Sequence, residues 1–401
     1  MGRDRFETWR RRGATLGQRR LAETIRRLIY QSDEALFDQL EFSNDAVFLQ
    51  PLLFSYFTDP SPSIGLPQIL YGSVPPGNRP STLQIATDVA GRATLGAFAD
   101  LETALPSAML DFGRRSDGSY GCSNGTTSLP FRMRAPLIVP GTQIEVTTEV
   151  HPLFYRFFDQ PDARLTDART VRVSQNCVSH LLMALGLMQM YCQPVWAEIA
   201  AFIRLIVLYR AVAPNSFAAK SAHGAIFCNV GADDDEIALL EDVAHQAAHD
   251  IFNAFSHDPM RLMVIDPDTP MNSLCDEAMD TRPINAAFHA LFTYTLICRV
   301  LTRVLDAGVL PERQVHEILG RLGLILCKFA YDLRILSLPS VYTLAGRRCH
   351  EAFDLEYQHF QGRYGALVDG FAYDNQPYAF DYACFVERNG GPWPVLRRAA
   401  S

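Results

Sequence analysis

The chain has 401 residues, of which 48% are hydrophobic and 20% are charged, and its formal net charge is -8. This composition is typical of a globular protein with one or two domains, and it excludes disordered and fibrous classes. A dedicated nucleic-acid binder is also excluded, because phosphate binding needs clustered cations. The nine cysteines form no C-x-x-C pair, so neither a zinc ribbon nor a disulfide framework is expected.

A basic segment over residues 3–27 opens the chain. Leu16, Leu21, Ile25 and Leu28 recur at helical spacing, which predicts one amphipathic helix. Its arginines are expected to face solvent; the alternative is that they dock an acidic peptide or partner. No apolar signal-peptide core follows, so a soluble, cytoplasmic protein is expected, without membrane or nucleic-acid partners.

Residues 1–177 are expected to form an N-terminal α+β region that is a possible peptide-binding part. Alternating β-branched residues on both sides of Pro140 and Gly141 predict two strands joined by a turn, and residues 169–177 predict a third. The apolar run 195–213 contains Arg204 and Arg210, which favours a buried helix to about Arg210 over a membrane span.

The second half of the chain is dominated by long apolar segments with helical periodicity. Residues 178–345 are expected to form a helical, metal-binding catalytic region, with helices over 231–257, 284–306 and 312–335 and a short strand at 223–230. Residues 346–401 are expected to form an extension packed on this core. The predicted class is α+β and mainly α-helical, with a small antiparallel sheet in the N-terminal half.

The stretch AHQAAHD places His245 and His249 one helical turn apart, so both imidazoles can converge on one cation. Asp242 and Asp250 are candidates for orienting the rings. Ten histidines in 401 residues give about 0.25 such pairs by chance, so two packed histidines without a metal stay an alternative. Gln246 follows the first histidine, where an H-E-x-x-H zinc peptidase has the glutamate that deprotonates the metal-bound water. An amide cannot take that proton, which disfavours peptide hydrolysis.

A little under a third of the chain, residues 214–337, resembles the HEXXH-motif domain of the iron- and 2-oxoglutarate-dependent peptide β-hydroxylases that modify ribosomally made peptides. That family has a serine-containing segment, a glycine strand, the histidine helix, an Arg-Pro pair and a helix with a further histidine. The matching residues are Ser216, Gly224, His245, His249, Arg282, Pro283 and His289. Gln246 departs from the family's glutamate, a loss that need not harm an oxygenase because its oxidant does not come from an activated water.

The resemblance implies an iron centre held by His245, His249 and His289, with three positions left for 2-oxoglutarate and O₂. Most such centres use a carboxylate as the third ligand, so Asp276, Glu277 and Asp280 are rivals of His289; His257 is too far along the first helix.

A 2-oxoglutarate enzyme also needs a cation for the distal carboxylate of its co-substrate, and an arginine suits that task. Arg282 is the first candidate, with a surface pair to Asp280 as the alternative role, and Arg299 and Arg303 are weaker ones.

The resemblance and the missing base together predict an Fe(II)/2-oxoglutarate-dependent oxygenase. The resemblance alone implies its substrate, a peptide such as a ribosomally made precursor in natural product biosynthesis, hydroxylated at a β-carbon of an amino-acid residue. The alternative from another class is a zinc metallohydrolase with an HxxxH site, or its inactive peptide-binding descendant. The oligomeric state is not predicted.

Overall fold

The computed structural model describes residues 3–158 and 173–391, and the chain divides into two compact units. The helical unit comprises Met1–Gly17, Gln175–Ala201 and Ala232–Ser401, and the sheet unit comprises Gln18–Ser174 and Phe202–Gly231. The predicted class, α+β and mainly helical, is confirmed. The division differs from the predicted one, because residues 1–17 group with the second half of the chain and residues 202–231 group with the first.

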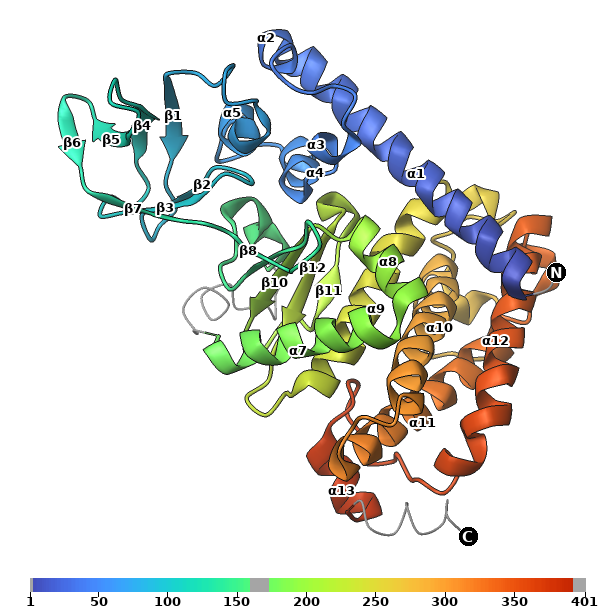
Figure 1. The fold of residues 1–401 in the computed structure, drawn as a ribbon. Coiled ribbons are helices and arrows are strands. Elements are labelled where there is room, and N and C mark those ends of the chain that lie inside the picture. The colour runs from blue at the N-terminus through green and yellow to red at the C-terminus, as the bar shows by residue number, and fades with distance from the viewer. Residues whose placement is uncertain (1–2, 159–172, 392–401) are drawn as a thin grey trace. The chain divides into compact units, whose positions relative to one another are not determined.

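The helical unit is built around α10 (Ile284–Asp306), which packs against α9 (Glu236–Phe255), α11 (Glu312–Ile335) and α12 (Leu344–Val368) (Figure 1). Pro283 and Pro311 occupy the N-cap positions of α10 and α11, where proline stops the preceding chain from continuing the helix. The predicted bounds of these two helices are confirmed. The unit also contains the start of α1 (Arg3–Ser32), α7 (Gln175–Tyr191), α8 (Gln193–Phe202) and α13 (Tyr382–Asn389).

The helix that carries the histidine pair, α9, begins where its sequence supplies a cap. The Asp235 carboxylate accepts hydrogen bonds from the backbone N–H groups of Ile237 and Ala238, two donors that the first helical turn leaves without a partner. Apolar side chains that recur at three- and four-residue intervals are buried along the whole helix, from Ile237 to Phe255. A fixed start and one buried stripe together set the direction in which the other side chains of α9 point.

In the sheet unit the described strands form three sheets. Two are antiparallel, with orders β1-β4-β5-β6 and β2-β3-β7, and the third is mixed, with order β11-β12-β10-β9-β8. The hairpin predicted around Pro140 and Gly141 is present as β8–β9, and Gly141 has a φ of 75° in its turn. The strands are β1 (Thr82–Ala86), β2 (Arg92–Thr94), β3 (Asp100–Thr103), β4 (Met109–Arg114), β5 (Tyr120–Asn124), β6 (Thr127–Leu129), β7 (Phe131–Arg134), β8 (Leu137–Ile138), β9 (Glu145–Thr147), β10 (Leu205–Tyr209), β11 (Phe217–Ala218) and β12 (Ala225–Asn229).

The helices of the sheet unit precede its strands, apart from two short 3₁₀ segments. They are the rest of α1, α2 (Glu34–Phe37), α3 (Asp45–Phe48), α4 (Pro51–Thr58), α5 (Leu66–Leu70) and η1 (Tyr71–Ser73), followed later by η2 (Pro152–Phe157) and η3 (Lys220–Ala222). The predicted third strand over residues 169–177 falls in part outside the described residues, which omit 159–172; its last residues, from Gln175, are the first turn of α7.

The predicted helix to about Arg210 is wrong beyond Phe202, where α8 ends. The next residues form β10, which pairs in parallel with both β9 and β12. Ile206, Val207 and Leu208 are all fully buried. A strand covered on both faces has no polar alternation, so its periodicity does not distinguish it from a buried helix.

One described helix, α10, is long and apolar enough to cross a membrane by length and composition. However, 72% of its apolar window is buried inside the protein, as in the core helix of a soluble protein.

Glu145 on β9 is a half-buried carboxyl group, and its desolvation together with the charge of Asp100 raises its pKa to about 7. Between its ordinary pKa and pH 7 the folded chain therefore binds more protons at this site than the unfolded chain, so its contribution to stability falls as pH rises. Glutamine does not titrate, so Glu145→Gln should not show this fall. Between pH 5 and pH 8 the free energy of unfolding of the variant should rise by about 1–3 kcal/mol relative to that of the wild type. Urea unfolding of both proteins at the two pH values measures the difference, and parallel pH profiles would contradict the assignment.

Candidate histidine site

Three histidines from two helices lie together in the helical unit. The ring centroids of His245 and His249, one turn apart on α9, are 4.9 Å apart. His289 comes from α10, and its ring centroid lies 4.6 Å from that of His249. The packing of α9 along α10 thus brings together the three residues that the resemblance named as ligands, with His249 in contact with the other two.

The surroundings of these rings are apolar on the α10 side. Phe252 stands 4.6 Å from His289 between ring centroids, and Phe292 stacks on Phe252 at 5.4 Å. Burial, with a smaller contribution from the charge of Lys328, lowers the pKa of His245 to about 4, and burial with the neighbouring His245 lowers that of His249 to about 3. Both imidazoles are therefore neutral at pH 7, the form in which a histidine binds a metal ion.

The spacing of the rings can be compared with that of ligands on one ion. A metal–nitrogen bond of about 2.1 Å puts the ion about 3.2 Å from the ring centroid, so two rings about 100° apart have centroids about 5 Å from each other. Both measured pairs are close to this spacing. However, no group of three or more His, Cys, Asp or Glu side chains in residues 3–158 and 173–391 has the arrangement that holds a metal ion. The rings are therefore of the kind and of the pairwise spacing that a transition metal accepts, but as they stand they do not form a site for one ion.

Gln246 does not act as a substitute base. Its side chain is 3% exposed, and its Nε2 donates a hydrogen bond to the Asp242 carboxylate, one turn back along α9, at 3.1 Å. Asp242, predicted as a group that orients the histidines, thus contacts the amide that replaces the catalytic glutamate. Asp250, the other such candidate, is fully buried.

Arg282, the candidate for the co-substrate carboxylate, is engaged by two carboxylates of the protein. Its Nε and Nη2 donate to Asp280 at 2.9 and 2.7 Å, and Nη2 also donates to Asp332 of α11 at 2.7 Å. The Tyr294 hydroxyl donates to the same Asp332 carboxylate at 3.0 Å. The pair with Asp280 is the alternative that the sequence left open, and Asp332 and Tyr294 extend it into a cluster.

The rival carboxylate ligands lie elsewhere. Asp280 is bound to Arg282, Glu277 forms an ion pair with Arg334 at 2.8 Å, and Asp276 is exposed. His257 lies beyond the last residue of α9, Phe255.

Of the other residues in the resemblance, Pro283 is the N-cap residue of α10. Ser216 and Gly224 belong to the sheet unit: the Ser216 hydroxyl accepts a hydrogen bond from the Asn229 backbone at 2.8 Å, and Gly224 has a φ of 88° immediately before β12.

Sequence reasoning missed Lys328 of α11, whose charge acts on His245. Its Nζ donates to the Tyr378 carbonyl at 2.7 Å, and burial lowers its pKa. The only signal was compositional: Lys328 is one of two lysines in the chain and interrupts an apolar run.

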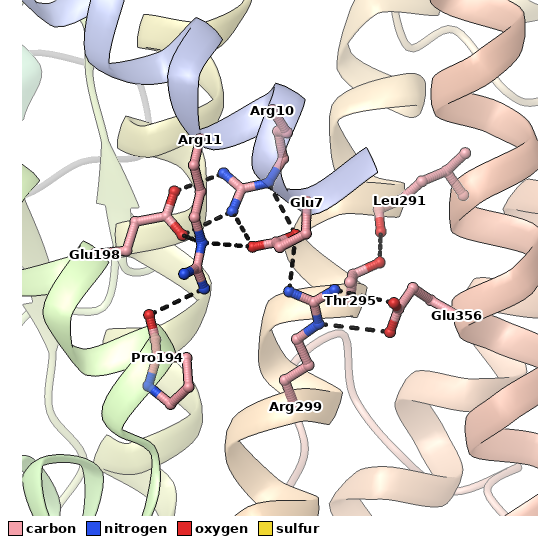
Figure 2. A network of polar contacts seen from close by, with 9 residues as sticks. All are labelled: Glu7, Arg10, Arg11, Pro194, Glu198, Leu291, Thr295, Arg299 and Glu356. Carbon is pink, nitrogen blue, oxygen red and sulfur yellow. Dashed lines mark hydrogen bonds and ion pairs between the residues drawn. The ribbon is translucent and has the colours of Figure 1, made fainter. Parts of the chain in front are cut away.

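A network of charged side chains was also missed (Figure 2). The guanidinium of Arg10, which is 0% exposed, donates through both terminal nitrogens to Glu198 of α8 at 2.6 and 2.7 Å. Glu7 accepts further bonds from Arg10 and pairs with Arg299 of α10 at 3.0 Å, and Arg299 donates to Glu356 of α12 at 2.9 Å. The expectation that the N-terminal arginines face solvent is therefore wrong for Arg10.

The network reaches the histidines through aromatic rings. The Arg10 guanidinium lies 4.7 Å from the centroid of Phe292, which stacks on Phe252, the ring that contacts His289. Although burial opposes it, the charges of Arg10 and Arg299 hold the pKa of Glu7 well below its ordinary range, so Glu7 stays ionised. The charged network thus supports the aromatic rings that pack against His289.

Comparison of the sequence with models of known protein families gives no match, and comparison with the curated proteins gives no significant match.

Proposed function

We propose that this protein is an Fe(II)/2-oxoglutarate-dependent oxygenase that hydroxylates a β-carbon of an amino-acid residue in a peptide. One observation carries the proposal: His289, forty residues away in sequence, lies against His249, as a three-histidine iron site requires. The peptide substrate, with a ribosomally made precursor as its possible source, and the cytoplasmic setting rest on the resemblance and on the sequence alone.

The chain's own residues have defined tasks in this proposal. His245 and His249 hold the ion from one helix, and His289 is the third ligand once the rings turn toward a common point. Phe252 and Phe292 exclude water from the side of His289. Iron, when bound with 2-oxoglutarate and O₂, supplies the oxidant that attacks the C–H bond. Such a reaction does not need residue 246 to accept a proton, so an amide at this position does not impair it. Hydrolysis does need a base there, and Gln246 therefore favours oxidation over hydrolysis.

The distal carboxylate of 2-oxoglutarate needs a cation, and the structure offers two. Arg282 binds it by exchanging the carboxylates of Asp280 or Asp332 for that of the co-substrate. The charge of Lys328 acts on His245, and its Nζ donates a hydrogen bond to the Tyr378 backbone carbonyl. We propose Arg282 first, because an arginine binds a carboxylate through two parallel hydrogen bonds.

The direct test is turnover of 2-oxoglutarate by protein purified without oxygen and loaded with Fe(II). The proposal expects succinate on addition of 2-oxoglutarate and O₂, and a co-produced peptide heavier by one oxygen atom. Succinate formed in the absence of peptide is a readout that does not depend on knowing the substrate. A raised KM for 2-oxoglutarate in Arg282→Gln or in Lys328→Gln identifies the cation. If the iron-loaded protein forms no succinate with or without peptide, the proposal is wrong.

Gln246→Glu separates this proposal from a zinc hydrolase with a borrowed base. We expect the zinc-loaded variant to gain no peptidase activity, because the side chain at position 246 is directed along α9 to Asp242 and the proposed reaction is not a hydrolysis. Cleavage of a fluorogenic peptide library measures the result, with zinc-loaded wild type and Gln246→Ala as controls. Metal-dependent cleavage by Gln246→Glu alone would favour the hydrolase.

A further inference from the structure

A cavity apart from the histidines lies in the helical unit, in the part of it that is formed by the start of α1, the start of α8, the C-terminal half of α10 and α12. Its cavity encloses about 1010 Å³, which is at the upper end of the range of small-molecule sites. Five arginines and three carboxylates line it, so its wall has an excess of positive charge in a chain whose net charge is -8. The net charge of this lining is therefore positive, whereas that of the whole protein is negative.

The three carboxylates are all bound to cations of the same wall. Glu7 and Glu356 pair with Arg299 at 3.0 and 2.9 Å. Asp306 pairs with Arg363 at 2.9 Å and accepts hydrogen bonds from the Tyr364 hydroxyl at 2.8 and 2.9 Å. Each carboxylate is thus paired with an arginine of the wall, and the unpaired arginines leave the lining with a net positive charge.

Arg5 and Arg303 also line the cavity, and they differ from the other charged residues of its wall in having no ion-pair partner among the described residues there. Both are exposed, and neither guanidinium forms an ion pair or a hydrogen bond with any other residue that the structure describes. Two arginine forks that face one cavity without carboxylate partners are suited to bind separate phosphate or carboxylate groups through parallel hydrogen bonds.

The charged side chains on the floor of the cavity are held in place by ion pairs with one another. Arg299, Glu7 and Glu356 belong to the charged network of Figure 2, and their side chains are at most 17% exposed. Val195 and Phe360, both buried to within a few per cent, add apolar surface to the same wall. A preorganised floor lowers the entropic cost of binding, and apolar lining favours a ligand with a carbon skeleton over a bare inorganic ion.

We propose that this cavity binds a small organic molecule that carries at least two phosphate or carboxylate groups, held by Arg5 and Arg303. The site uses none of the histidines and goes beyond the oxygenase proposal, so each stands or falls without the other.

Titration calorimetry on the full chain at constant ionic strength tests the proposal. Fructose 1,6-bisphosphate is the phosphate probe, tricarballylate is the carboxylate probe, and fructose is the uncharged control. We expect at least one anion to bind the wild type, and the stronger of the two assigns the group. The double variant Arg5→Gln/Arg303→Gln should bind at least tenfold more weakly. Arg12→Gln, an exposed arginine of α1 outside the cavity, should bind like the wild type.

A variant that is expected to bind more tightly controls for loss of folding, because a misfolded protein could only bind more weakly. Asp306→Asn removes a negative charge and releases Arg363, so it should bind the preferred anion severalfold more tightly than the wild type. Binding of neither anion by the wild type would overturn the proposal. So would equal weakening by Arg12→Gln, or an Asp306→Asn variant that binds no more tightly.

Discussion

Glu198→Ala is expected to destabilise the chain by about 3–5 kcal/mol, the cost of leaving a buried charge without its partner. The Arg10 guanidinium is 0% exposed and donates to both Glu198 oxygens, whereas Glu7, its other partner, also serves Arg11 and Arg299. Removing Glu198 leaves three arginines with two carboxylates, and the one among them that is fully buried, Arg10, loses the partner that binds both of its terminal nitrogens. The free energy of unfolding from urea denaturation of the full chain measures the effect.

Arg11→Ala is the matched control. Arg11 also contacts Glu198, at 3.4 Å, but its side chain is 38% exposed, so we expect a loss of no more than about 1 kcal/mol. Adding Arg10→Met to Glu198→Ala should recover more than half of the lost stability, because it removes the uncompensated charge and keeps apolar contact with Phe292. Equal losses for Glu198→Ala and Arg11→Ala, or no recovery in the double variant, would contradict the importance of the buried pair.

The local elements that sequence predicts well are those with long periodic patterns and definite ends. In α10 and α11 an apolar stripe of several turns follows a proline, and both the type and the bounds of these helices were predicted. The run over Leu205–Tyr209 is five residues long and apolar throughout, so the sequence does not say whether it lies in a helix or a strand. Its partners, β9 and β12, decide this through parallel pairing, which is not encoded locally.

The site shows the same limit. His245 and His249 follow from a spacing of four on one helix, a local property. His289 is supplied by the resemblance, and its contact with His249 depends on how α9 packs along α10. The ion pair of Arg10 with Glu198 joins residues 188 positions apart, and nothing in the spacing of the α1 arginines distinguishes the buried one from those in water. Long-range electrostatic pairs of this kind follow from tertiary packing alone.

His249→Ala is expected to abolish stoichiometric iron binding and 2-oxoglutarate turnover together. His249 is the ring that contacts both other histidines, so its loss leaves His245 and His289 without the group between them. Two separated imidazoles cannot provide the three ligands on one face that an oxygenase iron site needs. Loss of a single group that only orients a ligand already costs about 10–100-fold in metal affinity, and loss of the ligand itself should cost more.

Metal content after anaerobic loading and desalting, with the X-ray absorption edge to identify the ion, measures this prediction. His180→Ala is the control, because His180 is a histidine of the same unit whose Nδ1 interacts with the Asp234 carbonyl rather than with the other rings. It should keep iron and turnover at the wild-type level. An Asp at position 289 discriminates further: His289→Asp should retain iron if the third position accepts the carboxylate that most such centres use. If His249→Ala keeps the iron content of the wild type, the three rings are packed histidines, and the oxidation chemistry must be sought elsewhere in the protein.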